Sequence, residues 1–208
     1  MPLPPATART HIHTRRIECR GYEREDGLWD IEGHLVDTKT YGWHSDYRGE
    51  VAAGVPVHEM WLRVTVDEDL LIHEVEAASD FHPFHLCPTV TPNFATLKGL
   101  TIGPGWRREV RARVGGVKGC THLVELLWPI ATTAFQSIFP AREKRAREHG
   151  ETMGHERRGR PELIDSCKAL AHDSEVESAT GPTITRAREA FWPRRASRWR
   201  ATARARRP

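Results

Sequence analysis

The feature that most constrains the fold is an alternation of apolar and polar residues from Val57 to Val66. One face of this run carries His58, Met60, Leu62, Val64 and Val66. Successive side chains of a strand point to opposite faces of a sheet, so a period of two predicts a strand with one buried face. Asp67–Asp69 supplies turn residues, and Leu70–Ala77 is expected to return as the antiparallel partner.

A second hairpin is expected nearer the N-terminus, from Thr14 to Thr40. Ile17 and Cys19 alternate with charged residues, and Glu25–Gly27 has turn chemistry. The returning strand alternates Trp29, Ile31 and Leu35 with polar residues. The segment Tyr41–Gly54 between the two hairpins is interpreted as a polar, glycine-containing loop.

Helical patterns follow the two hairpins. A helix is predicted from Pro104 to Val114, closed by Gly115 and Gly116. A longer amphipathic helix is predicted after Thr121, with one apolar face made of Leu123, Leu126, Leu127, Ile130, Ala134 and Ile138. This order of elements predicts the α+β class, with an antiparallel sheet of hairpins followed by two or three helices packed on one face.

The chain is expected to hold one domain with appended segments. In order, the segments are a flexible lead (1–13), a single α+β domain (14–140), a charged linker (141–160), a short helix (161–182) and an Arg-rich disordered tail (183–208).

Composition excludes several classes of protein. Hydrophobic residues make up 38% of 208 residues, which is enough for an ordinary core. The longest uncharged run, Leu126–Ala141, is too short to span a bilayer, and no secretory signal is visible, so a cytoplasmic location is expected. The formal net charge of +3 comes from the tail after residue 182, which carries nine arginines. No base-reading motif accompanies this tail, so a nucleic-acid partner is not expected.

The common nucleotide and hydrolase motifs are absent. The chain has no phosphate-binding glycine loop of the P-loop type and no complete dinucleotide fingerprint, so no nucleotide cofactor is expected. His-Glu occurs three times, but none of the three completes the zinc-protease pattern.

The candidate metal ligands are His58, Cys87, Cys120 and His122. Cys120 lies just before a predicted helix, where unpaired backbone N–H groups favour a thiolate, and His122 follows in the first turn. Cys87 lies in a proline-bracketed loop after a strand. Thiolates and imidazoles together suit Zn²⁺ or iron, including an iron–sulfur centre.

Three strings of the sequence resemble one bacterial family. They are Arg24–Lys39, Val57–Arg63 and Gly119–Leu126, and they are similar to the domain-of-unknown-function family numbered 2889 over about Thr14 to Phe139. The resemblance implies a cytoplasmic bacterial protein.

The order of elements also resembles iron–sulfur cluster scaffold proteins. Carried over, Cys87 matches their middle cysteine, and Cys120 with His122 matches the last cysteine and its neighbouring histidine. Their first cysteine would fall near His58 and Glu59, where this chain has none. The comparison therefore favours a mixed nitrogen and sulfur site.

Three functions remain open. The first is a small metal-binding protein, which as an enzyme would be a metal-assisted hydrolase or lyase with Glu59 or Glu125 as base. The second is a metal-free thiol enzyme, with Cys120 as nucleophile and His122 as base. The third is a non-catalytic accessory protein whose sheet docks on a partner. A small molecule or a protein is the expected partner, and no pattern identifies the substrate.

Overall fold

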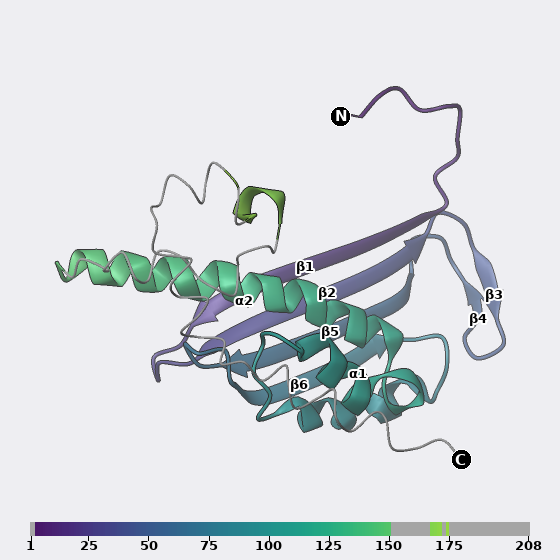
Figure 1. Cartoon of the computed structure of the whole chain (residues 1–208). Helices are drawn as coiled ribbons and strands as arrows, with labels where there is room; N and C mark the ends of the chain where they lie inside the picture. The colour runs from purple at the N-terminus through teal and green to yellow at the C-terminus, as the bar shows by residue number, and fades with distance from the viewer. Residues whose placement is uncertain (1–2, 151–166, 172–173, 175–208) are drawn as a thin grey trace, which may run out of the picture. The chain divides into compact units, whose positions relative to one another are not determined.

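The two predicted hairpins form one four-stranded antiparallel sheet in a computed structural model that describes residues 3–150, 167–171 and 174. The strands are β1 (His13–Glu23), β2 (Trp29–Lys39), β5 (Pro56–Val66) and β6 (Ile72–Phe81). They lie side by side in the order β1-β2-β5-β6, so the hairpin partners stay neighbours (Figure 1). The buried positions of β2, and those of β5 from Met60 to Val64, follow the period of two predicted from the sequence.

The segment expected to be a loop between the hairpins contains a small hairpin of its own. Its strands are β3 (Trp43–Ser45) and β4 (Gly49–Val51), which pair with each other in a separate two-stranded sheet. Gly49 has a φ of 67°, a left-handed conformation that glycine adopts easily. Strands of three residues carry too short an alternation to be recognised from sequence.

Helical elements follow the sheet and bury one of its faces (Figure 1). They are η1 (Cys87–Leu97, a 3₁₀ helix), α1 (Trp106–Val114), η2 (Gly116–Lys118) and α2 (Thr121–Glu148). One core joins Ile31, Leu35 and Leu62 of the sheet to Val110 of α1 and Leu126 of α2. The α+β class, with a sheet of hairpins followed by helices, is confirmed.

Helix α2 lies very close to the sheet because the strands carry glycine beneath it. A Cβ atom built on Gly33 of β2 would come within 2.8 Å of Ile130 Cδ1 and 2.9 Å of Leu126 Cγ. On β1, a Cβ atom at Gly21 would come within 2.8 Å of Ser137 Cβ. These glycines fix the height of α2 above the sheet, and with it the position of the first turn of the helix.

The structure describes only part of the segments that were predicted after residue 140. Helix α2 continues to Glu148, into the range 141–160 that was predicted to be a charged linker. Ala, Arg, Glu and Lys dominate residues 141–148 and are all strong helix formers, which explains the extension. The predicted helix at 161–182 lies outside the described residues apart from 167–171 and 174, where η4 (Lys168–Leu170) is one short turn. The Arg-rich tail lies wholly outside them.

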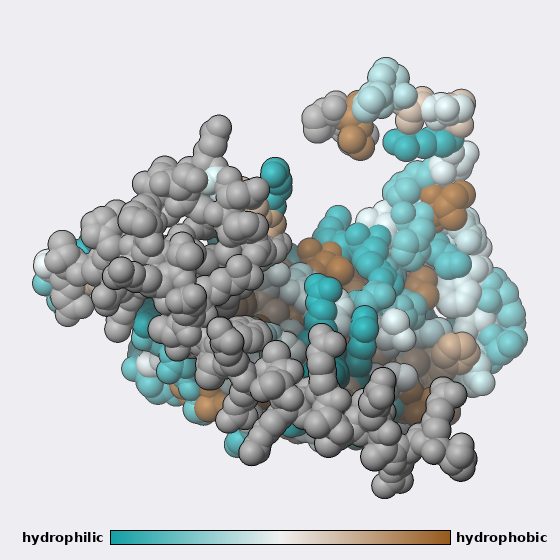
Figure 2. All heavy atoms as spheres, viewed as in Figure 1, coloured by the Kyte–Doolittle hydropathy of each residue, from teal (hydrophilic) through white to brown (hydrophobic). Residues whose placement is uncertain are grey.

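The elements of the sheet and its covering helices, α2 as far as Arg142, belong to the compact unit Met1–Arg142. In the coloured part of Figure 2, hydrophilic side chains predominate and hydrophobic ones are scattered among them. Among the described helices, none combines the length and the apolar character needed to cross a lipid bilayer.

Candidate metal centre

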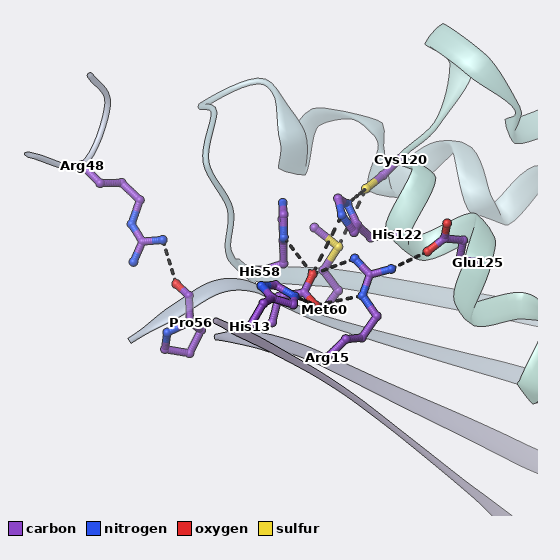
Figure 3. A network of polar contacts seen from close by, with 10 residues as sticks. His13, Arg15, Arg48, Pro56, His58, Met60, Cys120, His122 and Glu125 are labelled. Carbon is purple, nitrogen blue, oxygen red and sulfur yellow. Dashed lines mark hydrogen bonds and ion pairs between the residues drawn. The ribbon is translucent and has the colours of Figure 1, made fainter. Parts of the chain in front are cut away.

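Three polar side chains lie in a row across the helix-facing side of the sheet. Arg15 of β1 is the cross-strand neighbour of Asp37 of β2, and Asp37 is the neighbour of His58 of β5. Asp37 and His58 are in phase with the buried positions of β2 and β5, and Arg15 is in phase with Cys19, which packs against the core, so all three point toward the helices. His122, in the first turn of α2, reaches the same place from above (Figure 3).

Asp37, His58 and His122 form a compact group of possible ligands. One ligand atom from each residue lies within 4.8 Å of those of the other two. The Oδ2 atom of Asp37 is 3.0 Å from His58 Nδ1 and 4.0 Å from His122 Nε2. The two imidazole rings lie with their centroids 3.8 Å apart. The three side chains are mostly shielded from solvent, with exposed fractions of 1%, 15% and 24% in the order given.

A second set of contacts holds Asp37 in place. Arg15 donates from Nε to Oδ1 and from Nη2 to Oδ2, each at 2.8 Å, which is a bidentate pair. His13 Nε2 lies 3.2 Å from Oδ1. The remaining Nη1 group of Arg15 donates to Glu125 Oε2 at 2.6 Å, which ties the first turns of α2 to the sheet (Figure 3). Asp37 is therefore oriented before any ligand arrives.

The electrostatics keep the three groups in the states that a metal requires. Burial alone would raise the pKa of Asp37, but the hydrogen bonds and charge of Arg15, with His13 and His58, lower it to about 2. Burial, and then the charge of His122, lower the pKa of His58 to about 4 against the attraction of Asp37. Burial and the charge of Arg15 also lower the pKa of His122. At neutral pH the site thus offers one carboxylate and two neutral imidazoles.

Cys120 borders this group without joining it. Its Sγ atom lies 3.7 Å from His122 Nδ1 and 3.8 Å from the Sδ atom of the buried Met60. The carbonyl of Cys120 accepts a hydrogen bond from Val124 N at 2.9 Å, so Cys120 is the N-cap residue and lies outside the helical turn. Inside a helix, the side chains of residues i and i+2 point in different directions. Because Cys120 is the N-cap residue and lies outside the helical turn, its side chain can meet that of His122.

The predicted ligands therefore have different places in the structure. His58 and His122 come together, and Cys120 lies beside His122. Cys87 opens η1, and its thiol is not part of the ligand group. The two candidate bases are both paired elsewhere, since Glu59 Oε1 lies 3.0 Å from His34 Nε2 and Glu125 accepts from Arg15.

Sequence reasoning missed Asp37, although a signal for it was present. The buried face of its strand runs through Trp29, Ile31 and Leu35, and Asp37 is the next residue but one in that phase. A carboxylate in phase with a core must have partners, since burial of an unpaired charge is costly. The pairing of β2 with β5, which the structure shows, places it opposite His58 near the start of β5.

Comparisons with known proteins give one match. A profile of the family described as "Protein of unknown function (DUF2889)" matches residues 13–136, which covers β1 through the middle of α2. The matched segment contains Asp37, His58 and His122. No curated protein and no solved structure matches the chain, so the likeness to iron–sulfur scaffold proteins has no support from these comparisons.

Proposed function

We propose that this chain, which belongs to the DUF2889 family, binds a divalent metal ion, Zn²⁺ or Fe²⁺, through Asp37, His58 and His122. The observation that supports the proposal is the meeting of one ionised carboxylate and two neutral imidazoles within 4.8 Å. Two histidines and one carboxylate are a donor set of catalytic zinc sites and of non-haem iron sites. Both kinds of site leave a coordination position for water or substrate.

The spacing of the donors suits such an ion. Ligand atoms about 2.1 Å from a tetrahedral zinc lie roughly 3.4 Å from one another. The distances from Asp37 Oδ2 to the nearest nitrogens of His58 and His122 are 3.0 Å and 4.0 Å, on either side of that value. Small side-chain rotations would equalise them. Oδ1 of Asp37 would keep its contacts with Arg15 Nε and His13, while Oδ2, which also accepts from Arg15 Nη2, would bind the metal in place of its contact with His58.

A metal in this position supplies Lewis-acid chemistry: it lowers the pKa of a bound water and polarises a carbonyl oxygen. We therefore assign the protein to the metal-assisted hydrolases or lyases. The Cys19, Cys87, Cys120 and Cys167 thiols are all unpaired, which is the state expected in a reducing compartment, and we propose a cytoplasmic location.

Metal content tests the proposal. Wild-type protein supplied with Zn²⁺ or Fe²⁺ and then desalted should hold about one ion per chain, and His58→Gln and His122→Gln should each lose it. His73→Gln is the matched control, because His73 Nε2 also pairs with an aspartate, Asp67, at 2.9 Å but belongs to no ligand group among the described residues. Cys87→Ser should also keep the ion. Metal retained in both His58→Gln and His122→Gln would refute the proposed site.

A second candidate function rests on the contact of Cys120 with His122. Sγ lies 3.7 Å from Nδ1, and Nε2 of the same ring lies 4.0 Å from Asp37 Oδ2. Thiol, imidazole and carboxylate thus follow one another in the order used by cysteine nucleophiles with a histidine base. In this arrangement His122 would take the thiol proton, and Asp37 would orient the ring.

Alkylation of metal-free protein separates the two functions. If the thiol is the nucleophile, iodoacetamide should modify Cys120 faster than Cys87 in chelator-treated protein, and His122→Gln should remove the difference. Equal modification of the two cysteines, or a preference unchanged in His122→Gln, would exclude the thiol mechanism. Peptide mapping by mass spectrometry gives the rate at each cysteine.

A further inference from the structure

A cleft of about 260 Å³ lies where β6 ends and the β3–β4 hairpin turns. It is lined by Tyr47, Arg48, Asp80, Phe81, His82, Pro83, Phe84 and His85, and we call it the aromatic cleft. None of these residues belongs to the ligand group of the candidate metal centre. A cavity of about 150 Å³ is large enough for benzene, so the aromatic cleft has room for one substituted ring.

The walls of the aromatic cleft are aromatic rings that remain exposed. The ring of Tyr47 meets Phe84 edge-on at 5.2 Å and His85 at 5.4 Å. Tyr47 is 51% exposed and Phe84 is 53% exposed, so neither ring is used by the core. Aromatic side chains gathered in a concave place offer stacking and edge contacts to another ring.

Arg48 provides the positive charge of the aromatic cleft. Its Nη1 group donates to the carbonyl of Pro56 at 2.8 Å (Figure 3), and its guanidinium lies 5.3 Å from the centre of the Phe81 ring. Within the described residues, Nε and Nη2 donate no hydrogen bond and Arg48 makes no ion pair. The guanidinium is thus held by two contacts while directional donors remain free, an arrangement suited to a carboxylate.

Asp80 restricts which anions can enter. Its Oδ2 atom accepts a hydrogen bond from Trp61 Nε1 at 3.0 Å, and within the described residues Oδ1 accepts none. A carboxylate that lines the same cleft as Arg48 opposes the binding of polyanions such as nucleotides. The same carboxylate favours a ligand that carries one negative charge and also a hydroxyl that can donate to Oδ1.

We propose that the aromatic cleft binds a single-ring hydroxylated aromatic carboxylate. The carboxylate pairs with Arg48, the ring packs against Tyr47 and Phe84, and the hydroxyl donates to Asp80. This inference goes beyond the proposed metal function and does not depend on it, because every contact is made by protein side chains.

The test uses 4-hydroxybenzoate as the probe and isothermal titration calorimetry on the full chain in the presence of a chelator. Wild-type protein should bind with a dissociation constant below about 1 mM. Arg48→Gln should weaken binding at least about 10-fold by removing the charged partner, and Tyr47→Ala should weaken it several-fold. Arg108→Gln is the control, because Arg108 is another exposed arginine and lies outside the aromatic cleft.

Analogues test the chemistry on wild-type protein alone, which avoids any doubt about folding of the variants. Benzoate lacks the hydroxyl, cyclohexanecarboxylate lacks the aromatic ring, and phenol lacks the carboxylate, so each should bind more weakly than 4-hydroxybenzoate. No heat of binding with 4-hydroxybenzoate, equal affinity for cyclohexanecarboxylate, or unchanged affinity in Arg48→Gln would each overturn the proposal. Because the metal is removed throughout, these outcomes are independent of the metal proposal.

Discussion

Asp37 is ionised in a buried place because Arg15 pairs with both of its oxygens. Removal of the charge leaves Arg15 without its bidentate partner and weakens the link from Arg15 to Glu125. Asp37→Asn should therefore lower the free energy of unfolding by about 2 kcal/mol, in the range for hydrogen bonds to charged groups. Urea unfolding of metal-free protein measures this change.

The chain contains a matched control for Asp37. Arg24 donates to both oxygens of Asp26 in the same bidentate manner, but Asp26 lies on the surface with 51% of its side chain exposed. Exposed pairs contribute little to stability, so Asp26→Asn should have a much smaller effect. Equal losses in the two variants would show that burial of Asp37 adds nothing to its pair.

The lowered pKa of His58 makes stability depend on pH. Because the pKa is about 4 in the folded protein and 6.5 normally, the unfolded chain binds the proton first as the pH falls. The stability gained from neutral His58 is complete above about 6.5 and is lost as the pH falls toward 4, and His122 acts in the same direction. Protonation of Asp37, whose pKa is also lowered by folding, causes a further loss of stability at lower pH, between 3.8 and about 2.

Urea midpoints of chelator-treated protein between pH values of about 7 and about 5 test the contribution of His58. Wild-type protein should lose stability across this range, and His58→Gln should lose less. An equal change of the urea midpoint with pH in wild-type protein and His58→Gln would mean that His58 is not the titrating group.

At the scale of elements, the position of α2 on the sheet depends on Gly33. A methyl group there would meet Leu126 and Ile130 at less than 3.0 Å, so Gly33→Ala should cost about 1–3 kcal/mol of stability by overpacking. Displacement of α2 also moves His122, so metal affinity should fall together with stability. Gly103→Ala is the control, because no atom lies within 4 Å of a Cβ atom built at that position.

Thermal unfolding and metal competition measure the two effects of Gly33→Ala. If Gly33→Ala is as stable as Gly103→Ala, that result would contradict the close approach of α2 to β2. A destabilised variant with unchanged metal affinity would instead show that the height of α2 does not set the position of His122.

The elements that could be predicted from the sequence are those in which apolar residues recur at regular intervals over many residues. Strand β5 and the first turns of α2 carry strong periodicity, so His58 and His122 could be placed correctly on their elements. The β3–β4 hairpin was missed because its strands have three residues each. Asp37 was missed because its role depends on pairing between β2 and β5, which a single strand pattern does not contain.

At the scale of the whole molecule, a bound metal should stabilise the fold, because its donors come from β2, β5 and α2. An ion that binds only the folded state at about 100 times its dissociation constant adds about 2.7 kcal/mol. Zn²⁺ should therefore raise the melting temperature of wild-type protein and leave that of His122→Gln unchanged. An equal rise in both proteins would mean that Zn²⁺ binds elsewhere.

X-ray absorption fine structure of the zinc-loaded protein tests the central claim most directly. Zinc bound by Asp37, His58 and His122 should have only nitrogen and oxygen neighbours at about 2.0–2.2 Å, with the multiple-scattering pattern of two imidazoles. A sulfur neighbour at about 2.3 Å would contradict the account, because it would place Cys120 or Cys87 on the metal.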